Sequence, residues 1–224
     1  SQLYANADPK YNGRATVPAL VDITTKAIVN NDYHRLTNYL EVQSKPFHKE
    51  NAPDLYPEHL RKEIDKLNDE FLFHNVNNGT YRMMFAQSLI AYDEAYNDFF
   101  SALDNIEERL ETNRFLFGDY VTDSDIRLFV TLVRFETRYY RFLGPIKKRI
   151  TEYKNIWGYA RDLYAIPAFK NNTYLKDIAS TDGERKELFE SYATRFANEV
   201  DYDGLWSTPQ DRKNLSKTPD KFFF

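Results

Sequence analysis

The chain has 224 residues, a formal net charge of −4 and no cysteine. The negative charge argues against nucleic acid as a partner, because nucleic-acid binding depends on a basic surface. Without cysteine, these residues hold no disulfide, no thiolate metal site and no cysteine nucleophile. No apolar run approaches the roughly 20 residues that a membrane-spanning helix needs, and no signal peptide is visible. We therefore expect a cytoplasmic protein without a membrane partner.

The first expected elements are two short strands within residues 14–29, joined by residues 22–26. The run that carries them is apolar and β-branched but contains the step Val17-Pro18. Proline donates no ladder hydrogen bond, so it belongs at the first residue of a strand, at an edge or at a bulge. A cis peptide bond costs little only before proline, so this step is a natural place for one. The stretch is a candidate for a backbone that faces a ligand.

A short helix should follow, capped by Asn30 or Asn31 and running through Leu36, Tyr39 and Leu40. Proline and asparagine then break the regularity, and we interpret residues 46–57 as a linker.

From residue 58 onward the pattern is helical. Apolar residues recur at spacings of three and four, first at Leu60, Ile64, Leu67 and Phe71 and then along a longer helix that includes Tyr92, Phe99, Leu103, Ile106 and Leu110. A capping box at Thr122 and Asp125 should open a third helix, which is the most apolar and which we expect at the centre. A further helix ends before Pro167.

The C-terminal region shows a weaker pattern. Helical spacing recurs in residues 184–200, and the last twenty residues mix proline, charged and aromatic residues, which suggests an extended tail over the surface. The expected organisation is a small β-containing lobe in residues 1–45, the linker 46–57, an all-helical domain in 58–180, and a helix with an extended tail in 181–224.

A basic and aromatic cluster occupies residues 134–149. Arg134, Arg138 and Arg141 have a spacing that would place them on one helical face, with Tyr139 between them. Such a group can hold an anion or a planar ring through cation–π contact. The other interpretation is a solvated face with half-buried tyrosines behind it, which we favour for the arginines. For Tyr139 we favour a functional role.

Other common sites are not indicated. The four histidines do not pair at the spacing of metal ligands, so we expect no metal site. There is no glycine-rich phosphate loop and no Gly-x-Ser-x-Gly elbow. The acidic residues lie on predicted helix faces, where solvation explains them.

Together these segments resemble the glutathione transferase superfamily, and more narrowly its Xi class, the glutathionyl-hydroquinone reductases. The stretches specific to that class are Asn77-Asn78-Gly79-Thr80-Tyr81 and Thr131-Leu132-Val133-Arg134-Phe135, supported by residues 7–20, 28–31, 54–57, 125–129 and 157–164. The resemblance covers roughly residues 4–170. It implies a mainly α protein, in which a partial thioredoxin-like β-hairpin plus helix precedes an all-helical glutathione transferase C-terminal domain.

The resemblance also implies a glutathione site. In the family the Val-Pro bond is cis, and the Val17 backbone, beside Pro18, would pair with the cysteinyl part of glutathione like an added strand. Asp32 and Tyr33 would open a helix that faces the γ-glutamyl group. Tyr81 and Tyr139 fall on positions of tyrosines that line the family's quinone pocket. The implied partners are glutathione as cosubstrate, an aromatic or quinone small molecule, and a second copy in a homodimer.

The family's chemistry uses a cysteine thiolate that attacks the sulfur of a glutathionylated hydroquinone, and a second glutathione resolves the mixed disulfide. The Cys-Pro segment that carries this thiol should precede residue 1, so we assign no catalytic residue. Two features differ from the family: its Glu-Ser pair is Asp32-Tyr33 here, and a later tyrosine-bearing segment reads Ile178-Ala179-Ser180-Thr181-Asp182.

The expected parent activity is glutathione-dependent reduction of glutathionyl-hydroquinones by a thiol that this chain lacks. The alternative is a non-catalytic, degenerate transferase-like module for ligand binding or dimerisation.

Overall fold

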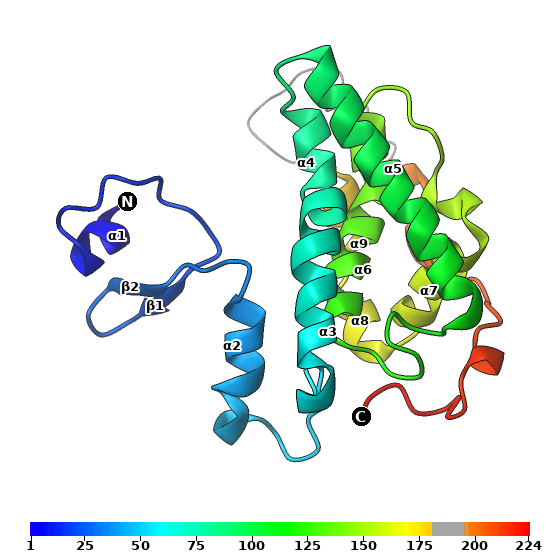
Figure 1. Cartoon of the computed structure of the whole chain (residues 1–224), viewed down its shortest axis with the longest axis horizontal. Coiled ribbons are helices and arrows are strands. Elements are labelled where there is room, and N and C mark those ends of the chain that lie inside the picture. The colour runs from blue at the N-terminus through cyan, green and yellow to red at the C-terminus, as the bar shows by residue number, and fades with distance from the viewer. Residues whose placement is uncertain (181–194, 196) are drawn as a thin grey trace. The chain divides into compact units, whose positions relative to one another are not determined.

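The structure is a computed structural model that describes residues 1–180, 195 and 197–224. The chain divides into two compact units, Ser1–Tyr56 and Pro57–Phe224 (Figure 1). The helical pattern predicted for residues 184–200 lies mostly outside the described residues.

The first unit is built around a β-hairpin. Its elements are α1 (Gln2–Ala7), β1 (Leu20–Asp22), β2 (Ala27–Asn30) and α2 (Leu36–Val42). The strands are antiparallel, with Leu20 opposite Asn30 and Asp22 opposite Ala27. The Asp22 carboxylate closes the turn by accepting from the amides of Thr24 (2.7 Å) and Thr25 (3.0 Å), and these bonds lower the pKa of Asp22. The two predicted strands are confirmed.

The extent of the first strand was predicted wrongly. Residues 14–19 form no strand, and β1 begins only at Leu20, two residues after Pro18. Because proline has no amide hydrogen for the ladder, pairing starts after it.

The start of the first-unit helix was also predicted wrongly. The helix α2 begins at Leu36 rather than at Asn31. The Asn30 side chain instead accepts from the Asp32 amide (2.7 Å), so it closes a turn that competes with helix formation. Asp32 and Tyr33 therefore lie in a turn that precedes the helix.

The second unit is a bundle of helices. Its longer elements are α3 (Arg61–Lys66), a π-helical segment (Leu67–Asn77), α4 (Gly79–Met84), α5 (Leu89–Thr112), α6 (Asp123–Thr137) and α7 (Lys154–Tyr164). The shorter ones are α8 (Pro167–Lys170), α9 (Leu175–Ala179) and α11 (Tyr202–Trp206). The helices α3 and α4 and the π-helical segment form one column, and α5 returns beside it (Figure 1). Most of the 15 residues of α6 are buried, which confirms its central position.

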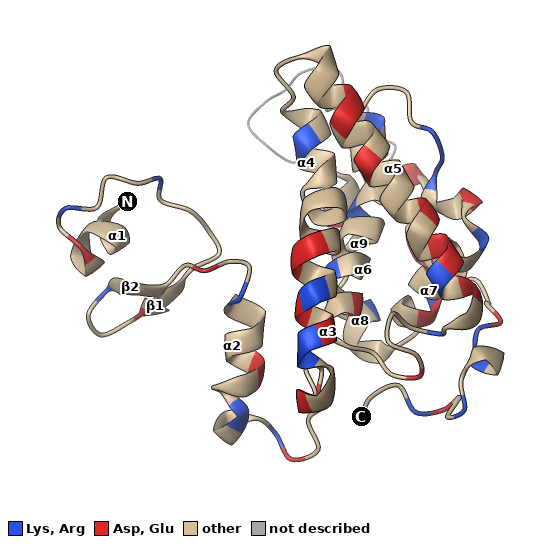
Figure 2. Cartoon of the chain, in the orientation of Figure 1, with Lys and Arg blue, Asp and Glu red and all other residues tan. Residues whose placement is uncertain are grey.

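The long helix α5 is amphipathic, as predicted. Phe99, Leu103, Ile106 and Leu110 are buried at helical spacing. Acidic side chains mark other positions along the same helix (Figure 2). Its first turn is capped by Ser88, whose hydroxyl accepts from the Ala91 amide at 3.1 Å.

The start of α6 carries the predicted Thr122–Asp125 capping box. The Asp125 carboxylate accepts from the Thr122 amide (2.8 Å) and also from the Thr122 hydroxyl (2.9 Å). The Asp125 amide also bonds to the Thr122 carbonyl at 3.1 Å. The same carboxylate accepts from the Leu116 amide and the Tyr159 hydroxyl, each at 2.9 Å. One side chain thereby joins α6, the loop before it and α7.

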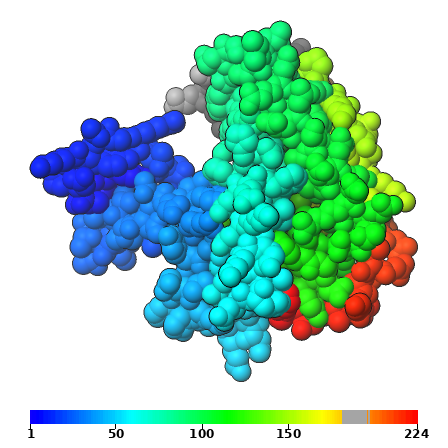
Figure 3. Space-filling view, in the orientation of Figure 1, coloured from blue at the N-terminus to red at the C-terminus, as the bar shows by residue number. Residues whose placement is uncertain are grey.

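Most of residues 207–224 are exposed or half-exposed and lie outside α-helices, as an extended surface tail would. Two side chains near its start are nevertheless buried. Trp206 is fully buried, with its ring 5.0 Å from that of Trp157. Arg212 is 5% exposed and donates to the carbonyl of Leu110 at 2.8 Å, where α5 ends. In Figure 3 the C-terminal residues lie against the helical bundle. Trp206 and Arg212 therefore anchor the segment to the bundle, while most of its other residues are exposed or half-exposed.

A buried ion pair anchors the C-terminal residues further. The Asp162 carboxylate of α7 accepts from Arg114 Nε (2.7 Å) and Nη2 (3.0 Å), and both side chains are almost fully buried. Arg114 also donates to the Pro219 carbonyl at 2.7 Å. This bidentate geometry compensates two charges that water no longer solvates.

Removal of the Asp162 charge should therefore destabilise the second unit strongly. We expect Asp162→Asn to lower the free energy of unfolding by about 3–5 kcal/mol, because the Arg114 charge would stay buried without compensation. Glu199→Gln, which breaks an exposed pair with Arg195, should cost less than about 1 kcal/mol. Urea unfolding followed by circular dichroism measures both, and equal midpoints for the two variants would contradict this account.

Candidate functional site

The Val17–Pro18 peptide bond is cis, and the Val17 side chain is 89% exposed. The preceding residue is fixed by Tyr4, whose hydroxyl donates to the Thr16 carbonyl at 2.6 Å. Among the described residues, the Val17 amide and carbonyl form no hydrogen bond. The main chain at Val17 thus has both polar groups available to an extended ligand.

The hairpin register places Asp32 and Tyr33 at the same end of the hairpin as Val17. Leu20 and Asn30 are paired, so Val17 lies three residues before one strand end and Asp32 two residues after the other. Both segments therefore leave the hairpin at the same end. Asp32 is exposed, with Oδ1 3.3 Å from the Arg35 amide, and Tyr33 is 57% exposed.

The second unit brings the two predicted pocket tyrosines together. Tyr81 lies on α4, and Tyr139 is the first residue of the 3-10 turn that follows α6. Their hydroxyl oxygens are 3.0 Å apart, and the rings make an edge contact with centroids 5.9 Å apart. Phe85 stacks on Tyr81 at 6.4 Å, which extends the aromatic surface. The pair spans 58 residues of sequence and depends on the packing of α4 against the end of α6.

The environment of Tyr139 keeps its hydroxyl protonated. Burial raises the pKa of Tyr139 well above its usual value, and the hydrogen bond with Tyr81 raises it further. The nearby charges of Arg134 and Arg138 act in the opposite direction but are smaller effects. At neutral pH the pair can therefore donate a hydrogen bond to an oxygen of a bound ring.

Part of the basic cluster lies beside Tyr139. A cavity of about 350 Å3 opens there, lined by Arg134, Arg138, Tyr139, Asn172, Tyr174, Asp177 and Ile178. The interpretation of the arginines as a solvated face is thus incomplete, since two of them share a cavity with the tyrosine.

The predicted common helical face of these arginines is wrong. Helix α6 ends at Thr137, and Arg138 has φ −139° and ψ −56°, outside the helical region. Arg141 therefore turns back and donates to the carbonyls of Thr137 and Ala179. Arg149 pairs with the buried Glu136 and stacks over the Tyr140 ring at 3.6 Å.

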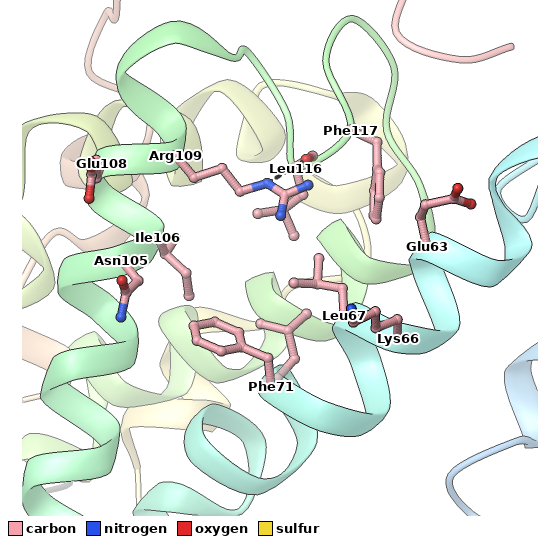
Figure 4. Close-up of a pocket in the computed structure, with 11 residues that line it drawn as sticks. Glu63, Lys66, Leu67, Phe71, Asn105, Ile106, Glu108, Arg109, Leu116 and Phe117 are labelled. Atoms are coloured by element: carbon pink, nitrogen blue, oxygen red, sulfur yellow. Dashed lines mark hydrogen bonds between the residues drawn. The ribbon is translucent and has the colours of Figure 1, made fainter.

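A second cavity, of about 870 Å3, lies elsewhere in the helical unit (Figure 4). Leu67 and Phe71 line it from the π-helical segment, and Ile106 lines it from α5. Arg109 projects beside them, donates from Nε to the Leu116 carbonyl at 2.8 Å, and lies over the Phe117 ring. The apolar spacing of these residues predicts core packing, yet they line a cavity. No tyrosine, histidine or thiol lines it, and we assign it no part in the chemistry.

Two further observations concern the part of the chain that the structure describes. It contains no group of three acidic or histidine side chains that could hold a metal ion. Within it, no helix is both long and apolar enough to cross a bilayer.

Comparison with known proteins places these features in a family. Residues 90–162 match the family model for the glutathione S-transferase C-terminal domain. A glutathione transferase from Gordonia bronchialis has a solved structure that superposes with a TM-score of 0.81 at 33% identity, covering 100% of this chain and 70% of that one. The Xi glutathione transferase from Phanerochaete chrysosporium superposes with a TM-score of 0.73 at 37% identity, covering 80% of this chain and 61% of that one. The chain belongs to the Xi class of the glutathione transferase superfamily.

Some curated relatives are named for an activity. The glutathionyl-hydroquinone reductase YqjG of Escherichia coli is 37% identical over 193 residues, which are 86% of this chain and 56% of that protein. Its glutathione-bound structure superposes with a TM-score of 0.73 at 38% identity, covering 80% of this chain and 58% of that one. The chain thus spans about half the length of the curated relatives it matches.

The sequence did not predict that Arg138 and Asp177 line a common cavity with Tyr139. They are separated by 39 positions and meet only because α9 packs against α6. The basic and aromatic cluster of residues 134–149 was the sequence signal for this cavity. The sequence did not show that the helix breaks at Arg138, so it did not show which way the side chains after the break point.

The raised pKa of Tyr139 predicts a loss of stability at high pH. An unfolded tyrosine ionises near pH 10, whereas folded Tyr139 keeps its proton. Stability is therefore fully present below pH 10 and falls as pH rises above it, because the unfolded state then binds fewer protons. Tyr139→Phe should make the free energy of unfolding fall less steeply with pH above pH 10. Tyr174→Phe, at a side chain that is 65% exposed, is the control, and an equal slope change in both would contradict the assignment.

Proposed function

We propose that this chain is the glutathione- and substrate-binding part of a glutathionyl-hydroquinone reductase. The observation that carries the proposal is the pair of segments at one end of the hairpin. There Val17 presents an amide and a carbonyl without partners among the described residues, and Asp32 presents an exposed carboxylate. These groups complement the extended, peptide-like backbone of glutathione and its ammonium group.

In this proposal Val17 pairs with the cysteinyl part of glutathione as an added strand would. The Asp32 carboxylate accepts from the α-ammonium group of the γ-glutamyl end, in a charge-assisted hydrogen bond. Pro18 and the hydroxyl of Tyr33 complete this surface. The glutathione-bound relative from Escherichia coli supports the assignment of the ligand.

The second unit supplies the proposed aromatic part of the site. The Tyr81–Tyr139 pair has two hydroxyl groups at hydrogen-bond distance and an aromatic surface extended by Phe85. A hydroquinone ring can pack against this surface while its oxygens bond with the tyrosine hydroxyls. The role of these tyrosines is to bind and orient the ring.

The reaction needs a thiol that these 224 residues do not contain. A cysteine thiolate would attack the sulfur of the glutathionyl-hydroquinone, forming an enzyme–glutathione disulfide and releasing the ring, which takes up a proton. A second glutathione thiolate would attack that disulfide, releasing oxidised glutathione and the enzyme thiolate. The ring gains hydrogen, and the thioether sulfur of the substrate and the thiol of the second glutathione become one disulfide, so atoms and electrons balance.

Calorimetry with glutathione tests the first site. We expect the chain to bind glutathione and Asp32→Asn to lower the affinity about tenfold, because a charge-assisted hydrogen bond is lost. Tyr33→Ser should retain the affinity, because serine keeps a hydroxyl at this position. Glu50→Gln, at an exposed acid of the same unit, is the matched control. Absence of binding by the unmodified chain, or the same loss in both acidic variants, would refute the site.

Turnover tests the activity. With glutathione and a glutathionyl-hydroquinone, the 224 residues alone should show only the uncatalysed rate, because they lack a thiol. A longer product of the same gene that includes a Cys-Pro segment should exceed it. If such a product binds glutathione but gives no turnover, the non-catalytic ligand-binding alternative holds. The homodimer remains a proposal from the family, and light scattering decides it.

A further inference from the structure

The cavity beside Tyr139 combines an aromatic wall with two guanidinium groups. Arg134, Arg138 and Tyr139 reach it from the end of α6, and Asp177 and Ile178 reach it from α9. Its volume of about 350 Å3 lies at the lower end of the range for small-molecule sites, which suits a single substituted ring.

The charges around the cavity favour an anion. Asp177 opposes two arginines, so the lining residues carry a net positive charge. Within residues 1–180, 195 and 197–224, neither arginine forms an ion pair. Arg134 donates to the Val130 carbonyl (3.1 Å) and Arg138 to the Ser180 carbonyl (3.3 Å). A guanidinium has five N–H donors, so each arginine keeps donors for a ligand.

The two arginines also act on the tyrosine itself. Both arginines line the cavity together with Tyr139, and their positive charges lower the pKa of Tyr139, against the larger effect of burial. A ring held against Tyr139 would therefore place its neighbouring substituents within the reach of Arg134 or Arg138. A carboxylate is well suited to that position, because guanidinium and carboxylate form two parallel hydrogen bonds.

We propose that Arg134 and Arg138 select aromatic substrates that carry an anionic group, such as a carboxylate, on the ring that contacts Tyr139. The inference deepens the proposed function, on which it rests for the identity of the ring as a hydroquinone. Arg138 is the residue directly before Tyr139. We therefore expect it to determine this specificity and test it first.

Calorimetry with two probes tests the selection. Hydroquinone and 2,5-dihydroxybenzoate share a ring with two hydroxyls and differ in one carboxylate. We expect the whole chain to bind dihydroxybenzoate at least about tenfold more tightly, with a preference that shrinks as salt is added. Arg138→Gln should lower the affinity for dihydroxybenzoate about tenfold and change the affinity for hydroquinone less than about twofold.

Three further variants test whether the preference for the carboxylate depends on the charges that line the cavity. Arg138→Lys should keep most of the preference, and Asp177→Asn should strengthen dihydroxybenzoate binding, since an opposing charge is removed. Lys147→Gln removes a half-exposed charge that does not line the cavity and should change neither probe. Equal affinities of the two probes, no binding of either, or the same loss in Arg138→Gln and Lys147→Gln would overturn the inference.

Glutathione binding, measured on the same preparations, distinguishes the two proposals. If the chain binds glutathione but shows no preference for dihydroxybenzoate over hydroquinone, the selectivity of the arginines is refuted and the proposed function is not. A retained preference without glutathione binding would refute the proposed function and leave the selectivity of the arginines in place. Thermal unfolding of each variant confirms that it is folded.

Discussion

The buried carboxylate of Asp125 is the constraint on which the helical unit depends. It accepts from Thr122, Leu116 and Tyr159, so it fixes the start of α6, the loop that precedes it and the neighbouring α7 together. Burial raises the pKa of Asp125, and these hydrogen bonds oppose that rise. With the start of α6 fixed, its other end at Thr137 delivers Tyr139 and Arg138 to the candidate site.

The two units present different kinds of chemistry. The first offers a main chain, at Val17, and one carboxylate, at Asp32, and its hairpin needs only a short turn to hold them at one end. The second offers side chains whose properties depend on a packed bundle, such as the hydroxyl of Tyr139. In the proposed function, recognition of the peptide-like glutathione and recognition of the ring would fall to two different compact units of the chain.

Local patterns predicted much of this fold. The apolar spacing of α5, the Thr122–Asp125 pair and the hairpin were readable because their causes lie within a few residues. The late start of α2 was missed because the Asn30 side chain closes a turn, and an asparagine there is equally compatible with a cap. Contacts such as Tyr81 with Tyr139, or Arg138 with Asp177 in one cavity, depend on tertiary packing, and only resemblance to a family could anticipate the first.

The placement of Arg212 has a consequence for synthesis of the chain. Its guanidinium satisfies the carbonyl of Leu110 at the end of α5, about a hundred residues upstream. During translation that helix end is made long before its partner leaves the ribosome, so the bundle must wait, incompletely bonded, until residue 212 has emerged. Completion of the helical unit is therefore coupled to synthesis through residue 212, and until then the nascent bundle is more exposed to aggregation and chaperone binding.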